Sequence, residues 1–122
     1  MEETGKSRRS IGTVYENEAV LFLEKKGYRI IERNYAIRQG EIDLVAQDGE
    51  YLVFIEVKYR SGGGVGAALQ AVTPAKQRKL IYAARSYLAR RGYGEWVPCR
   101  FDVLGFEGER IYHIEHAFEV NS

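Results

Sequence analysis

Two acidic residues and a lysine, Asp43, Glu56 and Lys58, interrupt the apolar runs of residues 40–60, GEIDLVAQDGEYLVFIEVKYR. Two carboxylates held close together repel one another, and a bound cation removes that repulsion. Mg²⁺ suits such a position because it binds one or two carboxylates together with water and substrate phosphate. A neighbouring lysine can orient a metal-bound water or stabilise negative charge on a phosphate. The residue types therefore indicate metal-dependent chemistry on phosphate, if the fold brings them together.

A tight hairpin would position these side chains, and Asp48-Gly49 between two apolar runs is a strong signal for its turn. With this pair as the loop, Gln47 is paired with Glu50. Asp43 and Glu56 then become diagonal neighbours on one face, about 7–8 Å apart. The lysine two residues beyond Glu56 shares that face, because side chains alternate along a strand. The same pattern also fits a surface hairpin with cross-strand salt bridges, so both interpretations stay open.

A third acidic residue, Glu16, lies in a segment of helical spacing over residues 11–26. Ala19 and Leu23 project to the same side of that helix as Glu16, at about 100° per residue. A glutamate on a core-facing stripe costs free energy unless a partner satisfies it, which favours a place at the same site. Alternatively, Thr13 and Glu16 form a capping box at the start of the helix.

The remaining elements are predicted from turn and capping signals. We expect a helix over 11–26 ending at Gly27, strands over 28–35, 41–47 and 50–59, a mobile glycine- and alanine-rich segment over 61–72, a helix from Thr73-Pro74 to about Gly92, and strands over 97–106 and 110–116. This order, α-β-β-β-α-β-β, predicts an α/β fold with a mixed sheet flanked by helices. Residues 1–10 are expected to form a flexible arm before one domain over 11–122.

Length and composition limit the class of protein. A chain of 122 residues with 45% hydrophobic and 29% charged residues is typical of one globular domain. The single cysteine, Cys99, cannot form an internal disulfide, which favours a reduced, cytoplasmic setting. No apolar run approaches the roughly 18 residues that a membrane span needs, so we expect no membrane contact.

The net charge of +1 conceals a strong segregation of charge. Between Val57 and Gly94 there are eight Lys and Arg and no Asp or Glu, which leaves 10 of the 18 basic residues beside all 17 acidic residues elsewhere. Nucleic acid is the natural target of such a region, although a solvated helix face is the alternative. Lys76 lies in the first turn of the second predicted helix, where phosphate also binds, or it is simply solvated. We expect Lys76, Lys79, Arg60 and Gln70 to contact nucleic acid.

Asp43 followed by Glu56-Val57-Lys58 resembles the D…ExK core of the PD-(D/E)xK, restriction-endonuclease-like nuclease superfamily. Longer matches resemble one branch, the YraN family of small bacterial proteins, which look like Holliday-junction resolvases. The matching segments are ENEA (16–19), KGY (26–28), RNY (33–35), GEIDL (40–44), FIEVKYR (54–60), AVTPAKQ (71–77), RFDV (100–103) and HIEHAF (113–118). They follow one another in order over nearly the whole chain.

The resemblance implies a mixed sheet flanked by helices, with a metal site at the mouth of the hairpin. Asp43 and Glu56 match the metal-binding acids of the superfamily, and the backbone carbonyl of Val57 would be a further ligand. Lys58 matches the lysine that orients water or phosphate. Glu16 matches a helix-borne glutamate and would be the third acidic ligand.

We therefore expect a metal-dependent endonuclease that hydrolyses phosphodiester bonds in DNA, with Mg²⁺ or Mn²⁺ as cofactor. The expected substrate is branched or damaged DNA, and the DNA partner is branched or single-stranded. One alternative is a nucleic-acid-binding module that keeps the fold without catalysis. Another is a protein-interaction domain whose basic helix binds an acidic partner. Cutting a junction requires two sites, which is consistent with a homodimer.

Other polar residues are given structural roles. His113 and His116 are three apart in a predicted strand and face opposite sides, so we expect no zinc site. Asp102 lies in an apolar strand and is expected to pair with Arg100 or Arg60. Trp96 and most of the nine tyrosines are expected in the core.

Overall fold

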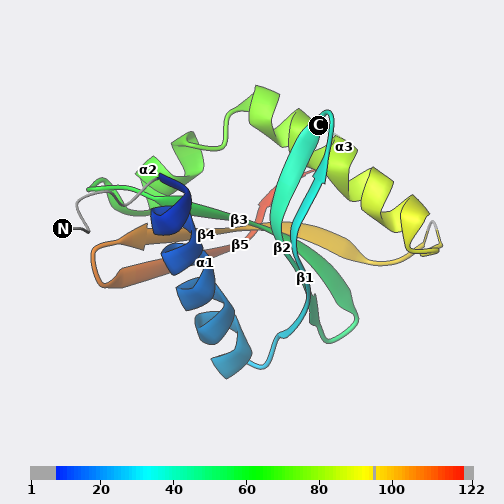
Figure 1. Cartoon of the computed structure of the whole chain (residues 1–122), viewed down its shortest axis with the longest axis horizontal. Coiled ribbons are helices and arrows are strands. Elements are labelled where there is room, and N and C mark those ends of the chain that lie inside the picture. The colour runs from blue at the N-terminus through cyan, green and yellow to red at the C-terminus, as the bar shows by residue number, and fades with distance from the viewer. Residues whose placement is uncertain (1–7, 95, 120–122) are drawn as a thin grey trace.

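Five strands form one mixed sheet in the computed structural model, which describes residues 8–94 and 96–119 (Figure 1). The strands are β1 (Arg29–Ile37), β2 (Gly40–Asp48), β3 (Tyr51–Tyr59), β4 (Cys99–Glu107) and β5 (Arg110–Phe118), and the helices are α1 (Arg8–Lys25), α2 (Gly64–Gln70) and α3 (Pro74–Arg90). The sheet order is β1-β2-β3-β4-β5; β3 and β4 are parallel, and the other neighbours are antiparallel. The predicted mixed α/β fold is confirmed, and every strand ends within two residues of its predicted position.

Helices cover both faces of the sheet and give two hydrophobic cores. On one face, α2 and α3 pack over the strands, with Phe54 and Tyr87 among the fully buried side chains. On the other face, Ala19 and Leu23 of α1 pack against Leu44 and neighbouring apolar residues. Figure 1 shows α1 and α3 on opposite sides of the strands. The candidate site lies between β3, the β1–β2 hairpin and the start of α3.

The hairpin of β2 and β3 has a different register from the predicted one. Asp48 pairs with Tyr51, so the loop is Gly49-Glu50 instead of Asp48-Gly49. Gly49 adopts φ 58°, a left-handed conformation that glycine takes without a steric penalty. The register moves by two residues, and an even shift keeps every side chain on its predicted face.

Two predictions about local structure were wrong. Helix α1 begins at Arg8, so residues 8–10 are helical and do not belong to the predicted arm, and Thr13 and Glu16 are not at the helix start; residues 1–7 lie outside the described residues. The segment expected to be mobile contains α2, whose Ala68 is buried against β4. A Cβ at Gly105 would lie 2.9 Å from that of Ala68, so two small residues allow the close contact that orders the segment.

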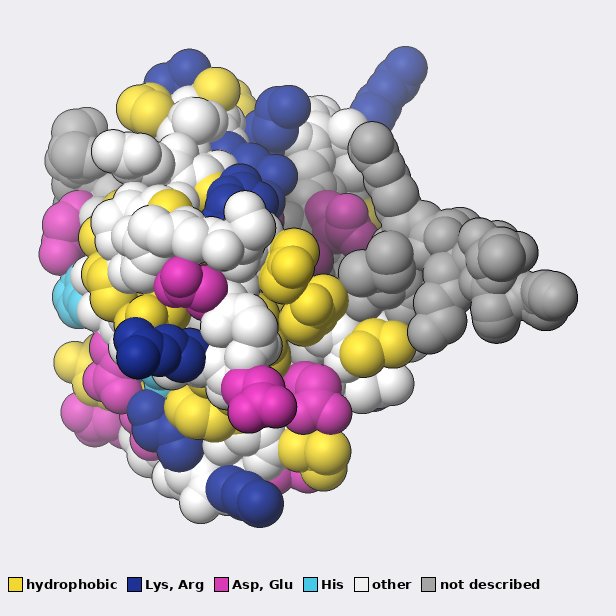
Figure 2. Space-filling view, turned by 90° about the vertical axis from the view of Figure 1, so that its left-hand side faces the viewer, with side chains coloured by type: hydrophobic (Ala, Val, Ile, Leu, Met, Phe, Trp, Pro, Cys, Tyr) yellow, Lys and Arg dark blue, Asp and Glu magenta, His cyan; other side chains and the backbone are white. Residues whose placement is uncertain are grey.

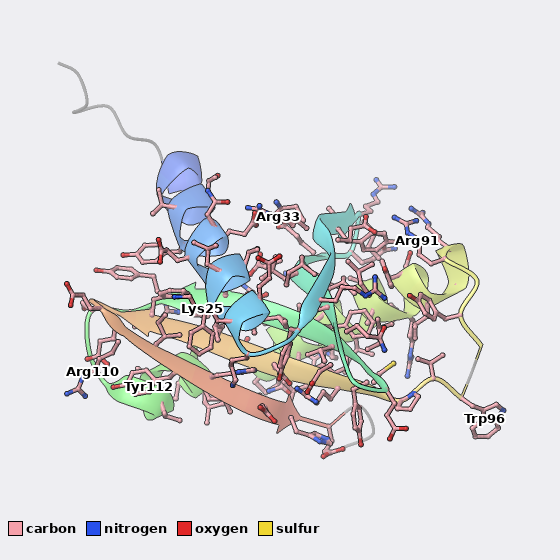
Figure 3. The ribbon with its side chains drawn as sticks, turned by 90° about the horizontal axis from the view of Figure 1, so that it is seen from below. Lys25, Arg33, Arg91, Trp96, Arg110 and Tyr112 are labelled. Atoms are coloured by element: carbon pink, nitrogen blue, oxygen red, sulfur yellow. The ribbon has the colours of Figure 1, made fainter. Side chains whose placement is uncertain are left out.

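The aromatic residues divide between core and surface. Only Tyr28, Tyr35 and Tyr87 of the nine tyrosines are buried. Tyr51, Tyr59 and Tyr82 are exposed, so the prediction that most tyrosines lie in the core was wrong. The prediction for Trp96 was wrong: this side chain is 91% exposed and points away from the body of the protein (Figure 3). None of the described helices is long and apolar enough to cross a membrane.

Candidate functional site

Strands β2 and β3 separate at Asp43. Their ladder ends at the pair Leu44–Ile55, and continuing that register by one residue brings Asp43 directly opposite Glu56. At this point Asp43 Oδ2 accepts a hydrogen bond from the backbone N–H of Val57 at 2.8 Å. Because the side chain takes the place of a ladder partner, the strands diverge without leaving that N–H unpaired.

A cavity of about 550 Å³ opens where the strands separate. It is lined by residues 36–41 of the β1–β2 hairpin, by Asp43, by residues 56–58 of β3 and by Lys76, Lys79 and Leu80 of α3. The structure thus brings together Asp43, Glu56 and Lys58, as the strand pattern predicted. The walls of the cavity combine the buried Glu56 and the half-buried Asp43 with lysines, a composition that can accommodate a phosphate-bearing ligand.

Glu56 is the centre of an ion-pair cluster. Its carboxylate is buried and lies 3.0 Å from the ammonium group of Lys58 and 3.7 Å from that of Lys76. Lys76 comes from the first turn of α3, where its backbone N–H is capped by the side chain of Thr73 at 3.2 Å. The cap fixes the start of the helix, and with it the position from which Lys76 reaches the acid on β3.

The electrostatics of the cluster are uneven between the two acids. Burial, followed by repulsion from Glu56, raises the pKa of Asp43 from its ordinary 3.8 to about 7, although the bond from Val57 and the charge of Lys58 oppose the change. Burial alone would lower the pKa of Lys58, but its contacts with Lys76 and Glu56 raise it. The contact with Lys58, and then burial, lower the pKa of Lys76. Asp43 is therefore the member of the cluster that lacks a sufficient counter-charge.

These residues fit a hard divalent cation in part. Asp43 and Glu56 are opposed carboxylates at a polar cavity, and Val57 lines the same space, so oxygen donors of the type that Mg²⁺ and Mn²⁺ prefer are present. A cation there would also remove the repulsion that raises the pKa of Asp43. Among the described residues, however, no three Asp, Glu, His or Cys side chains lie close enough together to hold an ion. The structure does not bring Glu16 into contact with the other two acids.

Glu16 is buried and is held by β1. Its carboxylate accepts hydrogen bonds from Arg33 Nη2 at 2.7 Å and Nε at 3.1 Å, and from Asn34 Nδ2 at 3.0 Å. Figure 3 shows Arg33 extending from β1 toward α1. The neighbours of Asn34 pair with Leu44 and Ile42, so Asn34 lies across from Asp43. Glu16 thus contacts β1, the strand next to the one that carries Asp43. Because α1 begins at Arg8, Glu16 lies inside the helix and not in a capping box at its start.

Arg33 and Asn34 were missed as part of this region. Both stand in the segment RNY that carries the family resemblance, but neither residue type nor spacing assigns them a partner. Asn34 adopts φ 55°, a left-handed conformation in which Asn is several-fold enriched. This backbone feature directs its amide to α1, and no periodicity in the sequence predicts it.

Gly40 sets the distance between the β1–β2 hairpin and α3. A Cβ built at Gly40 would overlap with the backbone carbonyl oxygen of Lys79. Only glycine allows this close approach, which holds the two walls of the cavity together. A glycine at the end of a strand is the only sequence feature connected with this contact, and it does not predict the contact.

The predicted nucleic-acid contacts separate into two groups. Lys76 and Lys79 line the cavity, but Arg60 and Gln70 do not. Arg60 is exposed beyond the end of β3 and donates to the carbonyl oxygen of Tyr59 at 2.7 Å. Gln70 is the exposed last residue of α2. Figure 2 views the molecule from the left-hand side of Figure 1. Many of the Lys and Arg side chains visible there lie in the upper part of the view, at the height of α2 and α3 in Figure 1.

A second buried polar cluster lies on β4 and β5. Asp102 pairs with Arg100 at 3.0 Å, as predicted, and also contacts His113 Nε2 at 2.8 Å and the backbone N–H of His116 at 3.0 Å. Burial would raise the pKa of Asp102, but the hydrogen bonds from His113 and Arg100 hold it below its ordinary value. The ring of His116 turns instead to Glu119, at 2.8 Å. Because Arg100, His113 and the backbone N–H of His116 all contact its carboxylate, Asp102 has a structural role that joins β4 to β5.

Comparison with known proteins places these features in one family. The model of "Uncharacterised protein family UPF0102" matches residues 15–106, which contain all the cavity residues. A UPF0102 protein from Nitrosococcus oceani is 46% identical over 95% of this chain and 97% of its own length. The UPF0102 protein YraN of Salmonella typhi is 46% identical over 95% of this chain and 89% of its own, and a UPF0102 protein of Cupriavidus taiwanensis is 45% identical over 95% and 88%.

Proposed function

The chain belongs to the UPF0102 family, which includes the YraN proteins, and we propose that it is a metal-dependent nuclease hydrolysing phosphodiester bonds in DNA. Branched or damaged DNA is the expected substrate. One observation carries the proposal: Asp43 and Glu56 face each other at a cavity that also contains Lys58, Lys76 and Lys79. Opposed acids disfavour a bound anion, whereas acids with a cation and flanking lysines favour a phosphodiester.

The two acids would hold Mg²⁺ or Mn²⁺ together with the backbone carbonyl of Val57, and the ion would supply a water of lowered pKa and a positive charge beside the phosphate. Glu56 is neutralised by Lys58 and Lys76 in the structure. With a cation held by the two acids, both ammonium groups would be available to contact the phosphate. Lys58, the more buried of the two, would orient the attacking water or stabilise the developing charge.

Glu16 enters the proposal through β1, because it bonds to Asn34, which lies across from Asp43. Its bonds to Arg33 and Asn34 support a role in fixing β1 beside Asp43. To bind the ion directly, Glu16 must exchange these bonds for the metal. Cation titrations of Glu16→Gln separate the two roles: a direct ligand weakens metal binding as strongly as Asp43→Asn does, whereas a supporting residue weakens it less.

A second candidate function is a nucleic-acid-binding module without catalysis. The ion pairs that Glu56 makes with Lys58 and Lys76 favour it, because they leave Glu56 neutralised without any metal. The pKa of Asp43, raised to about 7, favours the nuclease, because a binding module has no need of a second, poorly compensated acid at the same place.

Cleavage assays distinguish the two functions. Wild-type protein, Asp43→Ala and Lys58→Ala are compared on flap, junction and single-stranded DNA with Mn²⁺, and Glu50→Gln serves as the control. Glu50 is an exposed acid in the loop of the same hairpin and does not line the cavity, so its substitution removes a charge outside the site. The nuclease requires cutting by wild type and by Glu50→Gln, with loss of cutting in Asp43→Ala. If wild type cuts none of the three substrates but still binds them, the binding module is the correct function.

A further inference from the structure

The outer face of α3 carries a basic and aromatic strip apart from the cavity. Arg78, Tyr82 and Arg85 follow one another at intervals of four and three residues, so they project from the same side of the helix. With Ile81 they line a shallow hollow of about 220 Å³. The whole of α3 contains five Lys and Arg and no Asp or Glu. We refer to Arg78, Tyr82 and Arg85 as the α3 strip.

The side chains of the α3 strip are open to solvent. Tyr82 is 58% exposed, and both arginines are exposed. Among the described residues, neither arginine has an acidic side chain within ion-pair distance, whereas Arg91, just beyond α3, is paired with Glu32 at 2.8 Å. A tyrosine ring left largely in water between two uncompensated arginines contributes little to the core, so its position favours contact with a ligand.

The chemistry of the α3 strip fits a single nucleic-acid strand. Arginines bind phosphates, and an exposed aromatic ring between them offers a stacking surface for one base. Seven residues of α-helix rise about 10.5 Å, which separates the two arginines by enough for a nucleotide to lie over the ring between them. A base in a duplex has both faces covered by its neighbours, so stacking on Tyr82 requires an unpaired strand.

We propose that the α3 strip binds single-stranded DNA, with Tyr82 stacking on a base and Arg78 and Arg85 contacting the flanking phosphates. The inference rests on the proposed function in one respect, which is that the strand would lead to the cavity at the start of the same helix. Lys79, one residue after Arg78, already lines that cavity. The substrate would therefore contain an unpaired segment next to the bond that is cut.

Binding is tested without divalent metal, so that it does not depend on cleavage. Fluorescein-labelled oligo(dT) of about 12 nucleotides, within the range covered by one single-strand site, is titrated in EDTA and followed by anisotropy. Tyr82→Ala should weaken binding by about 5- to 100-fold, and Tyr82→Phe should stay within about twofold because the stacking ring remains. Replacing both arginines by alanine should reduce the slope of log affinity against log salt by about 1.4, since each phosphate contact on a single strand contributes about 0.7.

Arg90→Ala is the matched control. It removes the same charge from the same helix, but it lies about 120° around the axis from Arg78. Its affinity and salt slope should remain close to wild type. The inference is overturned if Tyr82→Ala binds as tightly as Arg90→Ala, if Tyr82→Phe loses as much as Tyr82→Ala, or if a blunt duplex of the same length competes as well as oligo(dT).

The outcome can be separated from that of the proposed nuclease. Asp43→Ala should bind oligo(dT) at least as tightly as wild type while cutting nothing in Mn²⁺. A wild type that binds through Tyr82 and cuts no DNA refutes the nuclease and leaves the α3 strip intact. A wild type that cuts DNA while Tyr82→Ala binds normally refutes only the α3 strip.

Discussion

Replacing Asp43 by asparagine should stabilise the metal-free protein and abolish its proposed activity. The pKa of Asp43 is raised from 3.8 to about 7, first by burial and then by Glu56. The folded state therefore holds the proton more tightly than the unfolded state does. Between pH 4 and 7 the wild type must lose stability relative to Asp43→Asn as the pH rises, and the full deficit is present above pH 7. The difference in the pKa of Asp43 between the unfolded and folded states corresponds to a loss of at most about 4 kcal/mol in the free energy of unfolding.

Solvent at the mouth of the cavity relaxes part of that energy, and an amide accepts the Val57 hydrogen bond less strongly than a carboxylate does. We therefore expect Asp43→Asn to increase the free energy of unfolding by about 1–3 kcal/mol at pH 8 in EDTA, and by close to zero at pH 4. Urea denaturation followed by circular dichroism measures both values. Mg²⁺ should then stabilise the wild type and leave Asp43→Asn unchanged.

Glu50→Gln is the control for this experiment, because it removes an exposed charge from the loop of the same hairpin, outside the cavity. Its stability should change by less than about 0.5 kcal/mol at either pH. The reasoning is refuted if Asp43→Asn is less stable than wild type at pH 8 in EDTA. It is also refuted if the gain is the same at pH 4 and pH 8, since a charge penalty must disappear when the acid is protonated.

Three further predictions concern the residues around the site and the second polar cluster. Lys58→Ala should reduce single-turnover cleavage in Mn²⁺ by about 100-fold. Mg²⁺ binding, measured by calorimetry, should be retained or strengthened because the ion pair with Glu56 is removed, and weaker metal binding would contradict this. Gly40→Ala should lose about 1–3 kcal/mol in urea denaturation, because its methyl group overlaps with the backbone of Lys79, whereas Gly66→Ala, in open space on α2, should be neutral or stabilising. Asp102→Ala should lose about 1–3 kcal/mol at pH 7, because Arg100 loses its fully buried partner and keeps only the more exposed Asp48 and Glu115. Since the pKa of Asp102 is lowered in the folded state, this loss should shrink below about pH 4, and a pH-independent loss would argue against the ion pair.

The strands and the two long helices could be predicted from local signals. Apolar periodicity, the glycines that end helices and Thr73-Pro74 at the start of α3 all act within a few residues, and the structure agrees with each of them. The prediction of a mobile segment over 61–72 was wrong, because the helix there is held in place by a tertiary contact. Ala68 packs against Gly105, almost 40 positions away, and glycine-rich composition conceals such a contact. The prediction that Trp96 is buried was wrong because it relied on residue type alone, and a large apolar residue is usually but not necessarily buried.

The grouping of Asp43, Glu56 and Lys58 could be predicted even with the wrong turn. Strand parity depends only on whether a register shift is odd or even, and the observed shift is even. The partners of Glu16 could not be predicted in this way. They depend on the angle between α1 and β1 and on the left-handed backbone at Asn34, neither of which leaves a periodic pattern in the sequence.

The two opposed acids of the cavity are stabilised by different means, and under the proposed function this difference would allow one site to be both stable and reactive. Glu56 has two lysines as permanent counter-charges, so it remains ionised and fixed within the sheet. Among the described residues, Asp43 has only a backbone N–H and more distant positive charge, and its pKa is raised to about 7. The proposed cation would compete with the lysines at Glu56 but only with a proton at Asp43. Under the proposed function, Asp43 would therefore be the acid at which the free energy of metal binding is gained, and the lysines released from Glu56 would be the groups left to face a phosphate.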